Sequence, residues 1–439
     1  MKNKTTNGFL TILFGILIVV LAAVIWRNIS LERDLSLERS LVTVDGKTPV
    51  PTPPPPENTS DPADDFIKDG DSSTSMRLAV AGDIVCHSGL NQEALQEDKS
   101  YDYAAIFGGA AGHLQKADYA VACIETTFPD TTDYSGYPMF KSPSDLAKSL
   151  ATAGIDMLST ASNHCLDASE AGLIRTLDVL DENGIAHVGT YRSKDERDAN
   201  NGIKVVEVNG ISIAFLAFTY GTNGMSIEGK DYLANVFYKD YLTDLSEINY
   251  DMLKADMAAA RELDTDVIAV WMHWGIEHYT KPVKVQYDLA DFLFAEGADL
   301  ILGGHTHVPQ PMELRELVDN EGNKKTGFIV YSLGNFVSCQ DGKYVNLTAI
   351  LNITLEKNQT SGETRIKSVN YAPMFMVDLE DYFSSPQEWR YRLWDLNTAI
   401  NNYDSGNDMG VINTNLYQAM KKGLEDIRGI LGEDMDMYS

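Results

Sequence analysis

The sequence predicts an α/β protein, with sheets flanked by helices and a transmembrane helix at the N-terminus. Between residues 266 and 310, the apolar runs Val267–Met272 and Asp299–Leu302 enclose Val285–Glu296, whose apolar residues have helical spacing. A helical crossover of this kind makes its two strands parallel. The second observation is Gly8–Trp26, a charge-free apolar segment of about the length that spans a bilayer.

Composition limits the class of partner. The chain has 439 residues, 44% of them hydrophobic, and a formal net charge of −29. Because no basic cluster offsets this charge, we expect no nucleic-acid partner. The four cysteines lack zinc-finger spacing, but Cys86 and Cys165 lie beside motif residues. Metal ligands, a disulfide and small loop residues all remain open for these two.

The N-terminal segment predicts a membrane anchor. Lys2 and Lys4 precede the apolar span and favour a cytoplasmic N-terminus, which places the globular part outside the cytoplasm. A cleavable signal peptide is the alternative, but Ala22-Ala23 is its only small-residue candidate for cleavage. We therefore expect a single-pass protein of the cell membrane with an extracytoplasmic domain.

Four parts follow from the pattern along the chain. Residues 49–56 are proline-rich and the following stretch is polar and acidic, which is typical of an extended linker. We predict an anchor at 1–27, a stalk and Pro/acidic linker at 28–75, the main domain at 76–345, and C-terminal strands with a helical extension at 346–439.

The first half of the main domain alternates strands and helices. Ser142 is the expected N-cap of one helix, with Pro143 at its first position. The predicted strands are Arg77–Ala81, Tyr119–Ile124, Asp156–Ser159 and Ile185–Val188, and the predicted helices are Asp102–Gln115, Pro143–Ala153 and Ser169–Glu182.

The second half begins with a hairpin, because Asn209-Gly210 suits a type I′ turn between two apolar runs. Thr219–Leu245 has no clear period and is either a substrate lid or an ordinary insertion. The predicted strands are Lys204–Val208, Ser212–Phe218, Gly327–Ser332, Val345–Leu355 and Arg365–Val377, and the predicted helices are Ser246–Leu263, Trp389–Ile400 and Leu416–Ile430.

Nearly every predicted core strand ends at a residue that can bind a metal. Parallel strands present their carboxyl ends at one edge of a sheet, so these residues can converge. Oxygen and imidazole ligands suit Mn, Fe or Zn, and the set is large enough for one or two ions bridged by a carboxylate. Solvated loop histidines are the alternative. The candidate ligands are Asp83, His87, Glu125, Asn163, His273, His305 and His307.

His164 is the candidate general acid. It follows Asn163 on a tight turn, and Asp167, three residues on, can hold its imidazole toward a leaving group. Asp167 can also cap the next helix through its side chain, and the two roles are compatible.

The ordered motifs carry a resemblance to a known family. They include Ser162-Asn-His-x-x-Asp167, His273-Trp-Gly-x-Glu277, Gly304-His-Thr-His307 and Tyr331-Ser-Leu-Gly-Asn-Phe336, together with Gln286 and Gln310. Over residues 76–340 the chain resembles the CapA-type poly-gamma-glutamate capsule biosynthesis proteins, within the calcineurin-like metallophosphoesterase superfamily. The resemblance implies a metallophosphoesterase-like fold with layered sheets.

The resemblance also implies a function. We expect work on an anionic polyglutamate or related envelope polymer at the cell membrane, alongside other capsule synthesis membrane proteins, with a metal-dependent hydrolase or transferase site. A non-catalytic subunit of a synthesis or export complex is one alternative, and a phosphoesterase acting on an envelope phosphoester is another. The superfamily pattern has Asp-x-His in the first strand and a Gly-Asp-x-x-Asp motif, whereas this chain has Val85 and Glu125.

Overall fold

The computed structural model describes residues 66–68, 70–318 and 324–438. The chain divides into two units, Met1–Asp64 and Asp65–Ser439, and the fold below is that of the second. The predicted anchor and most of the predicted linker lie outside the described residues. Within the described ranges, no helix combines the length and the apolar character needed to cross a membrane.

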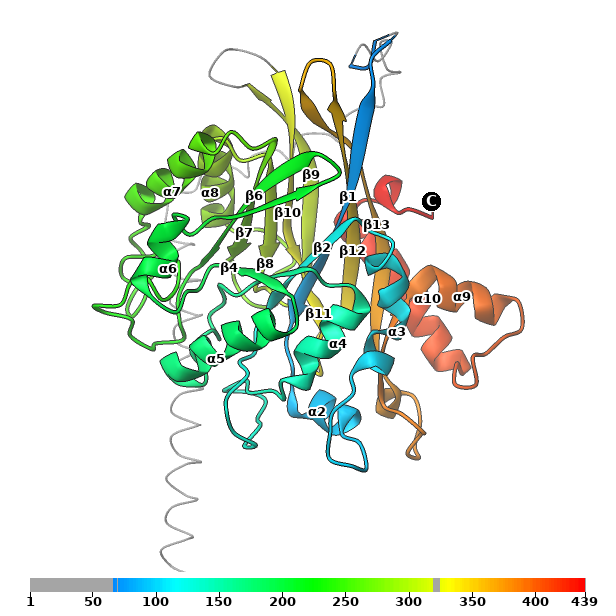
Figure 1. The fold of residues 1–439 in the computed structure, drawn as a ribbon. Coiled ribbons are helices and arrows are strands. Elements are labelled where there is room, and N and C mark those ends of the chain that lie inside the picture. The colour runs from blue at the N-terminus through cyan, green and yellow to red at the C-terminus, as the bar shows by residue number, and fades with distance from the viewer. Residues whose placement is uncertain (1–65, 69, 319–323, 439) are drawn as a thin grey trace, which may run out of the picture. The chain divides into compact units, whose positions relative to one another are not determined.

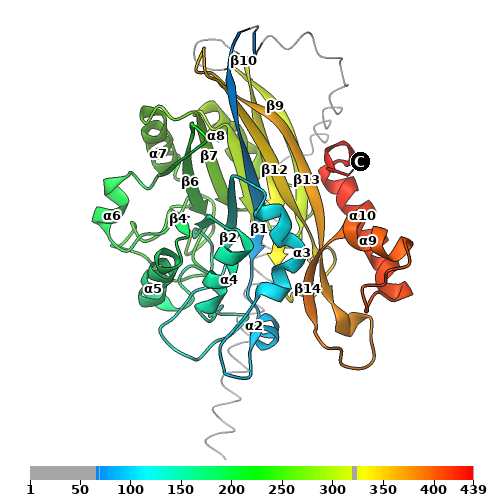
Figure 2. The ribbon, with the colours of Figure 1, turned by 45° about the vertical axis from the view of Figure 1, so that its right-hand side comes forward.

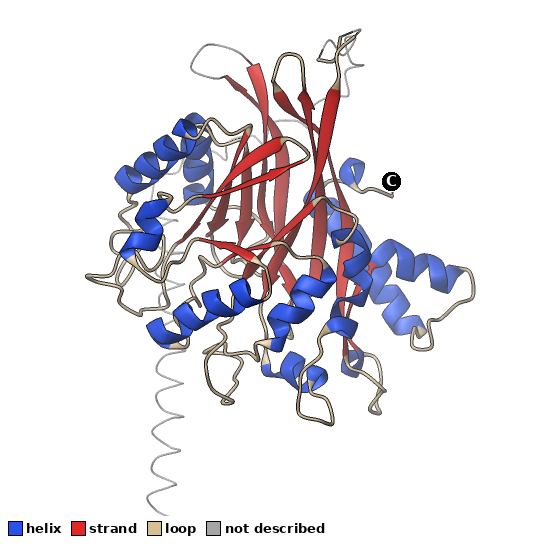
Figure 3. Ribbon diagram, in the orientation of Figure 1, coloured by secondary structure: helices blue, strands red, loops and turns tan. Residues whose placement is uncertain are grey.

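The first sheet has eight strands, in the order β14-β13-β12-β1-β2-β3-β4, with β11 paired to β1 (Figures 1 and 3). Strands β1 to β4 are parallel, whereas β12, β13 and β14 continue the sheet antiparallel from the other side of β1. The strands are β1 (Ser73–Ile84), β2 (Tyr119–Ile124), β3 (Met157–Ser159), β4 (Ala186–Val188), β11 (Asn335–Val337), β12 (Leu347–Asn358), β13 (Thr364–Asp378) and β14 (Tyr391–Asp395).

The second sheet has six strands, in the order β5-β6-β7-β8-β10-β9. The predicted parallel pairing around residues 266–310 is confirmed, because β7 and β8 are neighbours and His273 lies opposite Gly304. The predicted hairpin is also confirmed as β5 and β6. The strands are β5 (Lys204–Val208), β6 (Ile211–Thr219), β7 (Val267–His273), β8 (Leu300–Gly304), β9 (Pro309–Val318) and β10 (Lys324–Leu333).

The two sheets pack face to face, and helices cover their outer faces. One core cluster joins Leu78 and Val80 of β1 to Phe215 of β6 and Trp271 of β7. The first sheet is covered by α3 (Ala104–Leu114) and α4 (Asp145–Ala153), and the second by α7 (Tyr250–Glu262) and α8 (Lys284–Ala295). This is the mixed α/β architecture of layered sheets that the sequence predicts.

The remaining helices lie beside the sheets. α5 (Ser169–Glu182) precedes β4, and α2 (Ser88–Ala94) and α6 (Lys194–Ala199) are short. At the C-terminus, α9 (Leu396–Asp404) and α10 (Thr414–Leu431) pack against β12, β13 and β9, on the right in Figure 2. Three-residue 3₁₀ turns occur at Leu379–Asp381 and Glu433–Met435.

Two local predictions are wrong. The predicted helix Trp389–Ile400 is a strand in its first half, because β14 pairs with β13 and this pairing overrides helical spacing; α9 starts at Leu396, with the side chain of Asp395 as its cap. Ser142 does not cap α4. Its hydroxyl lies 2.8 Å from Thr126 Oγ1, and α4 begins two residues after Pro143.

Candidate metal centre

The carboxyl ends of strands from both sheets meet at one edge of the molecule. Asp83 lies at the end of β1 and Glu125 directly follows β2, whereas His273 ends β7 and His305 directly follows β8. The backbone N–H of His305 donates a hydrogen bond to Asp83 Oδ2 over 2.7 Å, so the two sheets are joined at the candidate site.

Two overlapping groups of potential ligands occupy this edge. Asp83, Glu125 and His307 bring their ligand atoms within 4.8 Å of one another, and so do Asp83, Cys123 and His273. All five side chains are buried, and Glu125 Oε1 also lies 3.7 Å from His273 Nε2. The two carboxylates therefore lie close to imidazoles from two elements, His273 at the end of β7 and His307 in the loop after β8, an arrangement that can hold a bridged pair of ions.

The buried polar atoms of the cluster are consistent with a cation. Asp83 Oδ1, both carboxylate oxygens of Glu125 and His305 Nδ1 are buried without a hydrogen-bond partner among the described residues. Such atoms are costly to bury unless they are hydrogen-bonded or bind a metal. Gly304 leaves the space they need, since a Cβ there would lie 2.4 Å from Asp83 Oδ1. The residues present thus fit one or two divalent ions.

Burial shifts the protonation of the cluster. It raises the pKa of Asp83 to about 7; burial, followed by the charges of Asp83 and Glu277, raises the pKa of Glu125 well above its usual range. Burial lowers the pKa of His307 to about 3 and those of His273 and His305 well below the ordinary value. Without a cation, the carboxyls therefore hold their protons to a higher pH than exposed carboxyls do, while the imidazoles are neutral, which is the form that binds metals.

The side-chain amide of Asn163, a predicted ligand, contacts His273 at the candidate metal centre. Its Oδ1 lies 2.8 Å from His273 Nε2, and its Nδ2 donates to Asn223 Oδ1 over 3.1 Å. Asn223 belongs to the 219–245 segment, so this loop orients Asn163 with its oxygen toward the imidazole. An amide oxygen and an imidazole nitrogen, both of types that can bind a metal, therefore lie side by side at the site.

Asn335 sets the orientation of His307, a role the sequence did not reveal. It lies opposite Asp83 in the β1–β11 register, and its Oδ1 is 2.9 Å from His307 Nδ1. An N–H at Nδ1 donating to this amide leaves Nε2 free to bind a metal. The available signal was the position of Asn335, three residues after the end of the predicted strand Gly327–Ser332.

Asp167 holds His164 and does not cap α5. His164 Nδ1 lies 2.7 Å from Asp167 Oδ2, and the same oxygen accepts the Phe140 N–H over 2.5 Å. The N-cap of α5 is Ala168, and no side chain caps the helix, so the capping alternative is wrong. Asn223 Nδ2 lies 3.3–3.4 Å from both nitrogens of the His164 ring.

His87 belongs to neither ligand group. Its Nδ1 lies 3.1 Å from Val85 O and accepts the Cys339 N–H over 3.3 Å, and burial lowers its pKa to about 4. Its ring packs edge-on against Phe140, which also contacts His164. The structure therefore places His87 on the rim of the site, and its role as a ligand remains a prediction.

Cys123 and Tyr220 are additional neighbours that sequence reasoning missed. Cys123 Sγ lies 3.9 Å from His273 Nδ1, whereas the Tyr220 ring stacks on His273 and has its centroid 4.6 Å from that of His305. Cys123 was detectable, because it lies in β2 two residues before Glu125, which directly follows that strand. Its thiol is free, as are those of the other three cysteines, and Cys86 and Cys165 belong to neither group.

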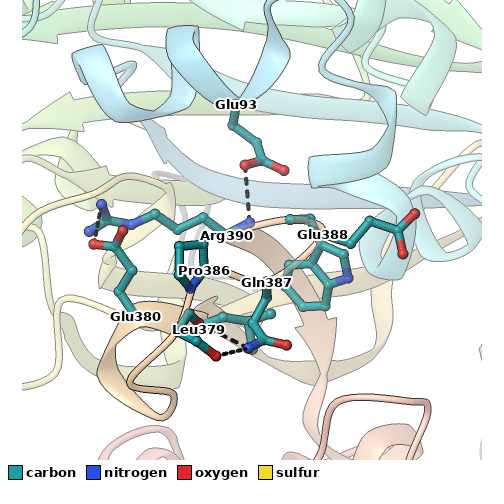
Figure 4. Close-up of a pocket in the computed structure, with 9 residues that line it drawn as sticks. Glu93, Leu379, Glu380, Pro386, Gln387, Glu388 and Arg390 are labelled. Atoms are coloured by element: carbon teal, nitrogen blue, oxygen red, sulfur yellow. Dashed lines mark hydrogen bonds and ion pairs between the residues drawn. The ribbon is translucent and has the colours of Figure 1, made fainter.

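A separate pocket lies between α2 and the segment before β14 (Figure 4). Arg390 is its main cation, but its guanidinium already pairs with Asp378 at 2.7 Å and with Glu380 at 2.5 Å. The backbone N–H of Arg390 donates to Glu93 over 3.0 Å. None of the predicted site residues lines this pocket, so the metal cluster is the stronger candidate site.

Comparison with solved structures gives low overall similarity. A phosphatase from Mycoplasma pneumoniae aligns with a TM-score of 0.41 and 13% identity, covering 69% of this chain and 94% of that one. A hypothetical protein from Thermus thermophilus aligns with a TM-score of 0.36 and 16% identity, covering 68% and 98%.

Comparison with known proteins gives the family. Capsule biosynthesis protein CapA of Bacillus anthracis is 26% identical over 294 residues, which are 65% of each chain. PGA biosynthesis protein CapA of Bacillus subtilis (strain 168) is 28% identical over 292 residues, which are 66% of this chain and 70% of that one. The family model described as bacterial capsule synthesis protein PGA_cap matches residues 77–340. The match covers more than half of the chain and includes every residue of the metal cluster, so this chain belongs to the PGA_cap family.

Proposed function

We propose that this capsule biosynthesis protein is anchored by residues 8–26 and uses an extracytoplasmic, metal-dependent hydrolase or transferase site on an anionic polyglutamate or related envelope polymer. Membership of the PGA_cap family supports a role in capsule biosynthesis. The proposal adds three points to that role: the identity of the polymer, the membrane anchor and the catalytic character of the site.

The main support for a metal-dependent catalytic site is a set of buried polar atoms at the sheet edge that lack hydrogen-bond partners among the described residues. Asp83 Oδ1 and both oxygens of Glu125 have no hydrogen-bond partner in the described structure, although both side chains are fully buried. A fold that needed these carboxyls only for packing would gain by replacing them with apolar groups. Their presence beside three neutral imidazoles supports a bound divalent cation.

The residues around the cluster would have different roles in bond cleavage or group transfer. The bound ions would supply Lewis-acid polarisation of the scissile group. His164, held by Asp167 through Nδ1, can present Nε2 to a leaving group and transfer a proton to it. Asn163 and Asn335 orient His273 and His307.

Recognition of a polyanion would rely on the metal more than on surface lysines. Lys284, near the loop after β7, donates to Asp288 over 2.7 Å, whereas Lys281 is exposed on that loop. With a net charge of −29, the protein as a whole repels a free polyanion. The ions would therefore provide the main attraction for polymer carboxylates.

The test is elemental analysis of the purified full-length protein. We expect at least one transition-metal ion per chain, lost or strongly reduced in His305→Ala and His307→Ala, because each change removes one imidazole ligand. His187→Ala is the matched control, since His187 pairs with Asp181 and is not one of the predicted ligands. Metal-free wild-type protein that still supports polymer production would favour the non-catalytic subunit.

A further inference from the structure

Cys123 faces His273 across the interior between the two sheets. Alternate residues of a strand share a face, and Val121 and Cys123 of β2 both belong to the core cluster that joins the sheets. Trp271 of β7 belongs to the same cluster, so His273, two residues later on that strand, points toward the first sheet. Cys123 Sγ accordingly lies 3.9 Å from His273 Nδ1. The thiol and the imidazole thus meet at the end of the core.

Asp83 completes a group of three side chains with different chemistry. It lies opposite Cys123 in the parallel register of β1 and β2, and ligand atoms of Asp83, Cys123 and His273 all lie within 4.8 Å of one another. All three side chains are fully buried. Among the described residues, Asp83 Oδ1 has no hydrogen-bond partner, which is costly in an interior unless a cation compensates. The carboxylate, the thiol and the imidazole are therefore close enough to bind one ion.

The separation of Cys123 Sγ and His273 Nδ1, 3.9 Å, fits two ligands of one zinc-sized ion. A zinc–sulfur bond is about 2.3 Å long and a zinc–nitrogen bond about 2.0–2.1 Å. The sulfur and the nitrogen bound to one tetrahedral ion are then about 3.6 Å apart, and two such ligand atoms can be at most about 4.4 Å apart. The observed separation lies between these values, so both atoms can reach the same ion.

His273 presents the ring nitrogen that this arrangement requires. Its Nε2 lies 2.8 Å from Asn163 Oδ1, an atom that can only accept a hydrogen bond, so Nε2 carries the hydrogen. Asn163 is held in this orientation because its Nδ2 donates to Asn223 Oδ1 over 3.1 Å. In the neutral ring the lone pair is therefore on Nδ1, the atom that faces Cys123. A histidine that binds a metal commonly donates its second N–H to an oxygen in this way.

The sulfur atom distinguishes this group from the other ligand group. Asp83, Glu125 and His307 offer only oxygen and nitrogen atoms, which suit manganese as well as zinc. A thiolate is a soft ligand that favours zinc over hard ions such as magnesium and manganese. The two groups share Asp83, yet their ligand atoms favour different ions.

We propose that Cys123 is a thiolate ligand which, with Asp83 and His273, forms a zinc-selective site distinct from the oxygen and nitrogen group. The inference rests on the proposed metal centre and adds the identity of one ion and a sulfur ligand. As the sulfur–metal bond forms, the thiol proton passes to solvent. Three protein ligands leave the fourth position of a tetrahedral zinc ion open, as in catalytic zinc sites.

The experiment is a Co²⁺ titration of metal-depleted, full-length protein, with a phosphine reductant keeping the thiols reduced. Co²⁺ occupies tetrahedral zinc sites, and a thiolate ligand gives it a charge-transfer absorption band in the near ultraviolet that carboxylate and imidazole ligands do not give. We expect this band in wild-type protein and its loss in Cys123→Ser and Cys123→Ala. Zn²⁺ affinity of one site should fall by at least about 10-fold, since even an outer-shell partner is worth that much.

Cys86→Ser is the matched control and should keep both the band and the affinity. Cys86 is as buried as Cys123, and its thiol donates to Asn91 Oδ1 over 3.1 Å. Thermal unfolding in EDTA should be similar for wild-type protein and at least one Cys123 variant, which shows that any loss of binding is not a loss of fold.

The outcomes separate this inference from the proposed function. If wild-type protein binds Co²⁺ and Zn²⁺ without the band, or if the band and the affinity persist in both Cys123 variants, Cys123 only packs in the core and the inference is wrong, while the metal centre stands. If wild-type protein binds no Co²⁺, Zn²⁺ or Mn²⁺, the proposed metal centre fails and this inference fails with it. Loss of the band in the Cys123 variants, with the band intact in Cys86→Ser, supports both.

Discussion

Asp83 and His305 are 222 residues apart in the chain, yet the backbone N–H of His305 donates to Asp83 Oδ2 over 2.7 Å. The bond connects the end of β1 in one sheet to the loop after β8 in the other. Because Asp83 belongs to both ligand groups, the relative position of the two sheets determines the geometry of the whole centre.

Replacing Gly304 tests whether this close approach is needed. In Gly304→Ala the new Cβ would lie 2.4 Å from Asp83 Oδ1, so the carboxylate must move away from the His305 amide. We expect a loss of about 1–3 kcal/mol in the free energy of unfolding, as for other overpacked interiors, together with weaker metal binding. Urea unfolding and Mn²⁺ titration measure the two effects.

Gly112→Ala is the control for that change. Gly112 lies in α3, and no atom approaches the position of its added Cβ within 4 Å. Alanine is favoured over glycine inside a helix by roughly 0.5–1 kcal/mol, so this variant should be at least as stable as wild type. Equal behaviour of the two variants would refute the importance of the space at Gly304.

Metal binding should release protons. Burial raises the pKa of Asp83 to about 7 and that of Glu125 well above its usual range, so these carboxyls keep protons in metal-free protein at a pH where exposed carboxyls are ionised. The imidazoles release none, because their lowered pKa values leave them neutral. Raising the pH favours the ionised carboxylates, and we therefore expect metal affinity to rise between pH 5 and 8.

Calorimetry in buffers of different ionisation enthalpy measures this release. Loading the cluster at pH 6 should liberate protons in wild-type protein, and fewer in Asp83→Asn if that variant still binds metal. Binding heats that do not depend on the buffer would contradict the assigned protonation states.

His164 should affect chemistry more than metal binding. It belongs to neither ligand group, and Asp167 holds its Nδ1 at 2.7 Å. In His164→Ala we expect normal metal content, with polymer cleavage or production reduced by about 10²–10⁴-fold, the usual contribution of general acid–base catalysis. Asn163→Ala, which removes a candidate ligand, should instead lower the metal content.

Polymer output and elemental analysis at matched protein abundance distinguish the two variants. Asp167→Asn should reduce polymer output by less than His164→Ala does. The amide oxygen of the asparagine is a weaker acceptor than the carboxylate, which accepts from both His164 and Phe140. Normal polymer output from His164→Ala would move the interpretation to a non-catalytic subunit.

The orientation of the protein in the membrane is open to a direct test. The charge-free segment 8–26 follows Lys2 and Lys4, so the domain should face the outside. Protease added to intact protoplasts should remove the domain while leaving a cytoplasmic marker protein whole. Protection of the domain until the cells are lysed would rule out this placement.

Local sequence determined much of the fold. The β7–α8–β8 unit was predictable, because its apolar runs and its helical spacing are patterns of neighbouring residues in the sequence. A helical crossover between two such strands makes them parallel. The same reasoning located His273 and His305 at strand ends. The helix expected over 389–400 failed where β14 pairs with β13, an interaction between segments that local periodicity does not encode.

Only the tertiary structure decided which atoms meet at the site. β12 pairs with β1 along most of its length, and β11 places Asn335 opposite Asp83, although these strands lie far along the chain from β1. The 3.9 Å separations that bring Cys123 to His273 and Glu277 to His307 likewise depend on how loops pack across two sheets. Sequence identified side chains able to bind a metal, because ligand chemistry belongs to the residue type; the distances that select among them arise from non-local packing, which the sequence determines only through the complete fold.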